Sequence, residues 1–68
     1  MTVASQVKQT LASLKGVRGN LRIYAAQSQH KEAVSAYTEA IEITEEVIDA
    51  LEHRISRLEF EEPQYKGL

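Results

Sequence analysis

The second half of the chain has the more regular pattern of apolar positions. Steps of three and four residues alternate through Val34, Tyr37, Ile41, Thr44, Ile48, Leu51, Ile55 and Leu58. This spacing is a heptad repeat, which places apolar side chains in one stripe along an α-helix. A strand would need a period of two, and neither half of the chain shows one. We therefore expect a helix over residues 31–62.

A similar stripe predicts a helix over residues 3–27. Its members are Val3, Val7, Thr10, Leu14, Val17, Leu21, Tyr24 and Ser28, with Leu11 alongside. The polar segment 27–30 interrupts both stripes and indicates a turn. Pro63 ends the second helix because proline cannot continue the hydrogen-bond ladder, which leaves residues 63–68 as a short extended tail.

So short a connection makes the two helices antiparallel neighbours, and the expected fold is an all-α two-helix hairpin. Centring the turn on Gln29 places Leu21 near Tyr37 and Val3 near Ile55. A chain of 68 residues without cysteine has a small core and no disulfide to support it. Its stability must come from regular helices, from association, or from both.

Charge is divided sharply along the chain. Residues 1–31 hold five cations and no acid, whereas residues 32–68 hold all ten acids and three cations. On one flank of the hairpin the first helix presents Lys8, Lys15, Arg18 and Arg22, and the second presents Glu42, Glu45, Asp49 and Glu52. We expect these flanks to neutralise each other and to specify orientation, because exposed ion pairs add little stability.

The seam of the hairpin is the pair of apolar stripes along which the two helices face each other. Small and apolar residues form a second strip on each helix, away from this seam. They are Ala12, Gly16, Gly19, Ile23 and Ala26 on the first helix, and Ala33, Ala36, Ala40, Ile43, Val47 and Ala50 on the second. A lone hairpin leaves these strips in water, and small side chains allow another backbone to approach closely. The strips predict a self-association interface, with two hairpins packed as a four-helix bundle in a homodimer.

No set of residues indicates catalysis or a cofactor. Glu42, Glu46, Asp49 and His53 share one helical stripe, but di-iron bundles need inward Glu-x-x-His pairs and further inward Glu. Here the stripe points away from the seam and the first helix has no carboxylate, so we interpret the stripe as a solvated acidic face. Without cysteine or a convincing Ser-His-carboxylate set, nucleophilic catalysis is not expected either, and the chain is predicted not to be an enzyme.

The basic flank supports an alternative function, in which Lys8, Lys15, Arg18 and Arg22 contact a nucleic acid or another anion. The acidic residues beside it and a pI of 5.6 argue against nucleic acid as a partner. Direct membrane insertion is not expected, because the longest apolar run covers only residues 23–26. Without a secretory signal in the sequence, a soluble protein in a reducing compartment is the expectation.

Both ends of the chain resemble a family of very short uncharacterised proteins from endospore-forming bacteria, catalogued as a domain of unknown function. The similarity lies in the first sixteen residues, in the turn Gln29-His30-Lys31-Glu32-Ala33, and in Leu58-Glu59 followed by the Glu-Glu-Pro-Gln-Tyr-Lys end at residues 61–66. Members of that family are often encoded beside spore membrane channel proteins. The resemblance therefore implies a role in sporulation or spore germination and carries no catalytic residues.

Pattern and resemblance together predict a non-enzymatic helical module that self-associates and docks on a spore membrane protein. Its expected location is the cytoplasm or spore interior, including the periphery of a spore membrane. Tyr65 in the tail is the expected anchor that folds back on the bundle or contacts the partner, because tyrosine is enriched at interfaces.

Overall fold

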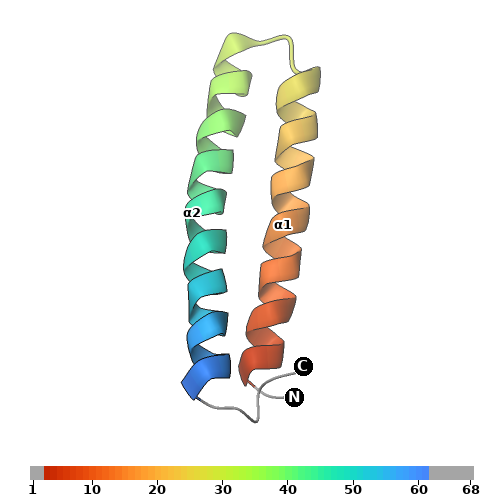
Figure 1. The fold of residues 1–68 in the computed structure, drawn as a ribbon. Helices are drawn as coiled ribbons and strands as arrows, with labels where there is room; N and C mark the ends of the chain where they lie inside the picture. The colour runs from red at the N-terminus through yellow and green to blue at the C-terminus, as the bar shows by residue number, and fades with distance from the viewer. Residues whose placement is uncertain (1–2, 62–68) are drawn as a thin grey trace.

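The computed structural model describes residues 3–61. In it, α1 (Val3–Gln27) and α2 (Lys31–Glu61) run side by side in opposite directions (Figure 1). The predicted all-α hairpin is confirmed, with helix bounds that match the expected ranges to within one residue. The expected tail and its anchor Tyr65 lie outside the described residues.

Residues 28–30 form the turn between the helices. The Ser28 amide donates to the Tyr24 carbonyl at 3.0 Å, and the Val34 amide donates to the His30 carbonyl at 3.0 Å, where α2 begins. Between them, the His30 amide donates to the Ser28 hydroxyl oxygen at 3.3 Å. Glu32 lies in the first turn of α2, where the positive end of the helix dipole stabilises a carboxylate.

The seam of α2 follows the predicted heptad positions at every step. All eight are buried or half-buried, and Ile48 and Ile55 are the most enclosed, at 1% and 9% exposure. Thr44 is tolerated in this stripe because its hydroxyl donates to the Ala40 carbonyl at 2.7 Å. The predicted seam of α2 is confirmed.

The seam of α1 differs from the prediction at alternate positions. It runs through Ala4, Val7, Leu11, Leu14, Arg18, Leu21, Ala25 and Ser28, all of which are buried or half-buried. Val3, Val17 and Tyr24, which were predicted in the seam, are 46–54% exposed. The observed α1 seam includes Leu11, and it places the cations Lys8 and Lys15 beside carboxylates of α2.

Two contacts are seen between side chains of the two helices. Ile55 lines a shallow open cavity of about 260 Å³ together with Lys8 and Leu11. Tyr37 packs against Tyr24, with ring centroids 5.8 Å apart, one turn from the expected Leu21. The register predicted for Leu21 with Tyr37 and for Val3 with Ile55 stays a prediction.

The core between the helices is thin. Among the described residues, only Ala4, Ile48 and Ile55 are buried. The hairpin is a rod with extents of 48 × 17 × 12 Å and a radius of gyration of 15.1 Å, whereas a compact domain of this length would have about 11 Å. Stability therefore depends on a few side chains of one seam.

Replacing Ile48 by Ala tests this dependence. Because Ile48 is 1% exposed, Ile48→Ala should lower the free energy of unfolding by about 2–5 kcal/mol. Ile23→Ala is the matched control, since Ile23 is 52% exposed and its truncation should cost no more than about 0.5 kcal/mol. Urea unfolding followed by circular dichroism, at one fixed protein concentration, measures both. Equal losses would contradict the assignment of Ile48 to the core.

Candidate interaction surfaces

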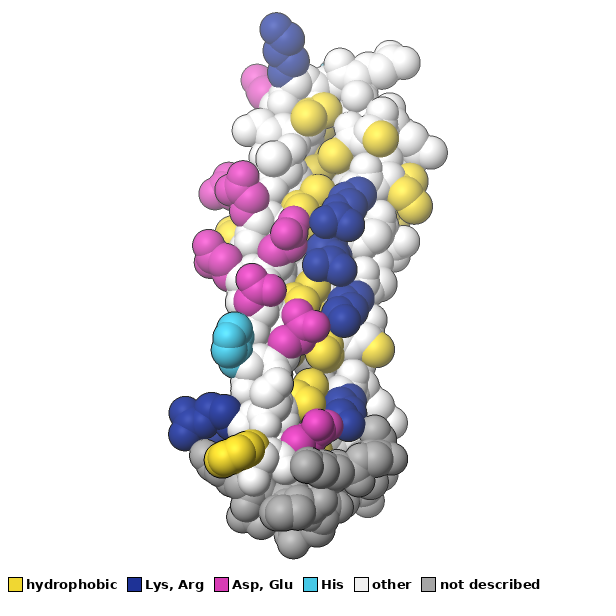
Figure 2. Space-filling model, viewed as in Figure 1, with side chains coloured by type: hydrophobic (Ala, Val, Ile, Leu, Met, Phe, Trp, Pro, Cys, Tyr) yellow, Lys and Arg dark blue, Asp and Glu magenta, His cyan; other side chains and the backbone are white. Residues whose placement is uncertain are grey.

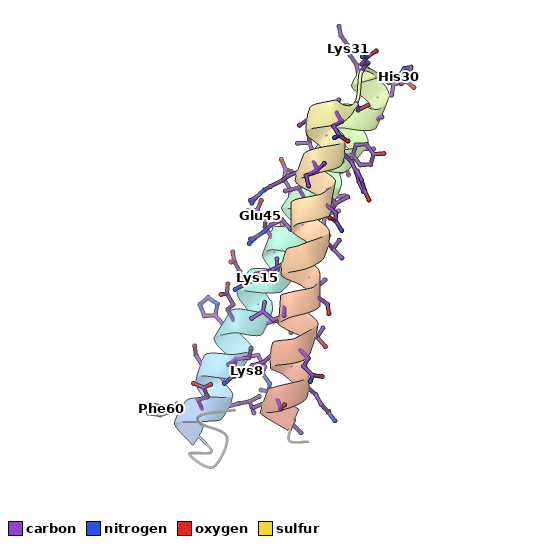
Figure 3. The ribbon with its side chains drawn as sticks, turned by 90° about the vertical axis from the view of Figure 1, so that its right-hand side faces the viewer. Lys8, Lys15, His30, Lys31, Glu45 and Phe60 are labelled. Atoms are coloured by element: carbon purple, nitrogen blue, oxygen red, sulfur yellow. The ribbon has the colours of Figure 1, made fainter. Side chains whose placement is uncertain are left out.

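A ladder of three ion pairs joins the helices along one flank of the hairpin. The pairs are Lys8 Nζ with Glu59 Oε1 at 2.7 Å, Lys15 Nζ with Glu52 Oε2 at 3.5 Å, and Arg22 Nη2 with Glu45 Oε1 at 3.5 Å. Figure 2 shows the cations of α1 facing the acids of α2, and in Figure 3 the labelled Lys8, Lys15 and Glu45 lie along the same side. Each partner recurs every seven residues, so the ladder repeats with the seam.

The predicted neutralisation between the flanks is confirmed for Glu45 and Glu52. The third acid is Glu59, which the prediction missed although it lies one heptad after Glu52. Of the predicted cations, Arg18 instead occupies a half-buried seam position. Side chains of the ladder remain 30–57% exposed, so each pair contributes about 0–1 kcal/mol. The ladder specifies which flanks of the helices meet more than it stabilises the fold.

The opposite side of the hairpin has no charge over most of its length. It consists of the residues that directly precede seam positions, which we call the charge-free face. On α1 these are Val3, Gln6, Thr10, Ser13, Val17, Asn20, Tyr24 and Gln27. On α2 they are Ala33, Ala36, Ala40, Ile43, Val47 and Ala50. Charge returns only toward the end of α2, at Arg54 and Arg57.

Large apolar side chains are exposed on this face. Val17, Tyr24, Ile43 and Val47 are 46%, 50%, 55% and 42% exposed, respectively. Both helices contribute to the set, and a ring contact connects Tyr24 to Tyr37 across the hairpin. Exposed apolar side chains of both helices therefore lie on the same side of the hairpin.

The structure separates the two strips predicted to form one interface. The α2 strip from Ala33 to Ala50 lies on the charge-free face. The α1 strip, from Ala12 to Ala26, lies beyond the ladder, because Ala12, Gly19 and Ala26 each follow a ladder cation by four residues. The prediction placed both strips on one side because it assigned Val3, Thr10, Val17 and Tyr24 to the α1 seam. The residue that directly follows each of them occupies the seam instead. We refer to the α1 strip as the outer strip.

The glycines of the outer strip are not required by packing within the chain. A Cβ atom added at Gly16 or Gly19 would have no neighbouring atom within 4 Å. Glycine in a helix costs about 1 kcal/mol relative to Ala. The hairpin itself therefore gives no steric reason for either glycine.

The remaining acids lie on the outward side of α2. Glu39, Glu42, Glu46 and Asp49 make no ion pair among those seen within residues 3–61. His53 follows them, with Nδ1 2.9 Å from the Asp49 carbonyl oxygen. Over the described part of the chain, no group of three or more His, Cys, Asp or Glu side chains is arranged to hold a metal ion.

Anion binding at the basic flank would compete with the ladder. Lys8, Lys15 and Arg22 each contact a glutamate, so an incoming phosphate would have to displace a carboxylate from each of them. The cavity beside Lys8 is apolar at Leu11 and Ile55 and also borders Glu52, which disfavours an anion there. Between residues 3 and 61, neither helix is apolar enough over a sufficient length to cross a bilayer.

Comparison with known protein families gives a match over most of the chain. Residues 7–55 match DUF1657, a family described as a protein of unknown function. The chain belongs to the DUF1657 family. No curated protein and no solved structure matches it significantly. The DUF1657 match includes the turn and most of both helices, so it covers the seam from Val7 to Ile55, the ladder up to Glu52 and the charge-free face from Thr10 to Ala50.

Charge reversal in this DUF1657 hairpin tests the ladder. Lys15→Glu places two carboxylates together and should destabilise the fold. Glu52→Lys should also destabilise the fold, because it places two ammonium groups together. The double variant restores the attraction with the partners exchanged. A double-mutant cycle at low salt should therefore give a coupling energy of about 0.2–1 kcal/mol that shrinks in 1 M salt. Strictly additive effects at low salt would contradict the pairing.

Proposed function

We propose that this DUF1657 protein is a non-enzymatic helical self-association and interaction module, and that it works as a homodimer in which two hairpins form a four-helix bundle. The observation that carries the proposal is the thin core. Between residues 3 and 61, one seam with three buried residues is little apolar burial to offset the chain entropy of two long helices. When two hairpins join, each of them buries a second layer of apolar side chains.

The exposed area supports association of two chains. Val17, Tyr24, Ile43 and Val47, large apolar side chains from both helices, are 42–55% exposed. A second copy packed on these side chains would remove their apolar area from water. A closed two-fold dimer is the commonest way for identical chains to bury such a surface.

A role in sporulation or spore germination, with docking on a spore membrane protein, is part of the proposal. Its support is the resemblance of the first sixteen residues and of the Glu-Glu-Pro-Gln-Tyr-Lys end to short proteins of endospore-forming bacteria. The dimer would be the unit that docks, because it retains the ladders and the acidic sides of both hairpins for contact with a partner.

Solution mass tests the homodimer. Light scattering and sedimentation equilibrium at micromolar concentration should give twice the chain mass of 7.6 kDa. The melting temperature should also rise with protein concentration, because association stabilises the folded chains by mass action. A well-folded monomer whose melting does not depend on concentration would refute the homodimer.

The cellular role has a separate test. A fluorescent fusion expressed from its own promoter in the native host should appear during sporulation and collect at a membrane of the developing spore. Deleting one spore membrane channel protein at a time should release the fusion from that membrane if that protein is the docking partner. Expression confined to vegetative growth would contradict the spore role without affecting the homodimer.

A further inference from the structure

We infer that the charge-free face is the surface through which two copies of this chain join. This assignment rests on the proposed homodimer and specifies the part of the hairpin that forms the interface. It replaces the α1 outer strip of the sequence prediction with the column containing Val17 and Tyr24 on the same helix. The occupant is a second copy of the chain, placed face to face with the first.

The distribution of charge is the first argument. In a chain of which 26% is charged, every residue that precedes a seam position from Val3 to Ala50 is neutral. The centres of protein interfaces are depleted of charge in the same way. Two identical charge-free faces can also meet without like-charge repulsion, whichever helix packs on which.

The exposed apolar side chains are the second argument. Five of the large hydrophobic residues exposed in the hairpin belong to this face, namely Val3, Val17, Tyr24, Ile43 and Val47. Around Ile43 and Val47 lie alanines, which let a second helix approach α2 closely. Burying this surface in both copies would remove these exposed apolar side chains from water.

The other surfaces are less suited to a second copy. The outward side of α2 presents Glu39, Glu42 and Glu46, which would repel the same acids of another chain. The ladder flank already pairs its charges within the hairpin. The outer strip adjoins the ladder cations and has one large apolar residue, Ile23.

Two isoleucines provide a matched test. Ile43 lies on the charge-free face and Ile23 on the outer strip, and they are 55% and 52% exposed in the hairpin. Ile43→Lys should raise the dimer dissociation constant at least about 100-fold, because it buries an unpaired ammonium in the interface. Ile23→Lys should leave the constant within about threefold of the wild-type value, since its ammonium stays in water. Sedimentation equilibrium measures both.

Cysteine labelling provides a second measurement that does not require the charged variant to fold. The chain has no cysteine, so Ile43→Cys and Ile23→Cys each introduce a single thiol. In folded wild-type-like dimers, a maleimide should modify the thiol at position 43 at least about tenfold more slowly than the thiol at position 23. Dilution below the dissociation constant should remove the difference.

The outcomes separate this inference from the proposed function. A monomeric wild-type protein would overturn both. A wild-type dimer that Ile23→Lys dissociates and Ile43→Lys does not would overturn only the choice of face, as would equal labelling rates at the two positions. Dissociation by Ile43→Lys together with protection of the thiol at position 43 supports the charge-free face.

Discussion

A hairpin of two helices can bury only one stripe of each helix, and this limit governs the rest of the structure. Every residue away from that stripe faces water unless another chain covers it. In this protein the stripe contains Ile48 and Ile55 at its most enclosed points, together with a threonine and an arginine that a larger core would exclude. The seam can therefore hold the helices together, but it provides little apolar burial beyond that.

The residues on the two sides of the seam differ in charge. On one side, cations follow the seam positions of α1 and carboxylates follow those of α2, so this pair of flanks is electrostatically favoured when the helices are antiparallel. On the other side, neutral residues precede the seam positions of both helices. Each heptad thus contains the residues of the seam, the charged residue that favours the antiparallel orientation, and neutral residues of the charge-free face.

Prediction from the sequence was accurate where the pattern allowed one interpretation. The α2 seam has β-branched or large apolar residues at nearly every heptad position, and no neighbouring stripe competes with it. In α1, two stripes share Val7, Leu14 and Leu21 and differ in the residues between them. Apolar spacing alone favoured the stripe with Val17 and Tyr24, whereas the structure places Arg18 in the seam.

That one-residue difference also explains which surface was misjudged. Placing Val17 and Tyr24 in the seam removed them from the surface and left the glycines and alanines of α1 as the apparent match for the α2 strip. The position of the ladder contained the missing information, because Lys8, Lys15 and Arg22 are seven residues apart and each lies one helical turn before a position that only the observed stripe contains. Combining charge spacing with apolar spacing would have selected the observed seam.

The rod shape of the hairpin affects how the protein migrates. A particle of 48 × 17 × 12 Å experiences more friction than a sphere of the same mass, so a single hairpin elutes from a sizing column ahead of a globular protein of 7.6 kDa. Two hairpins packed side by side would double the mass while adding little to the length. Monomer and dimer therefore differ less in elution volume than in mass, so a direct measurement of mass distinguishes them better than column position does.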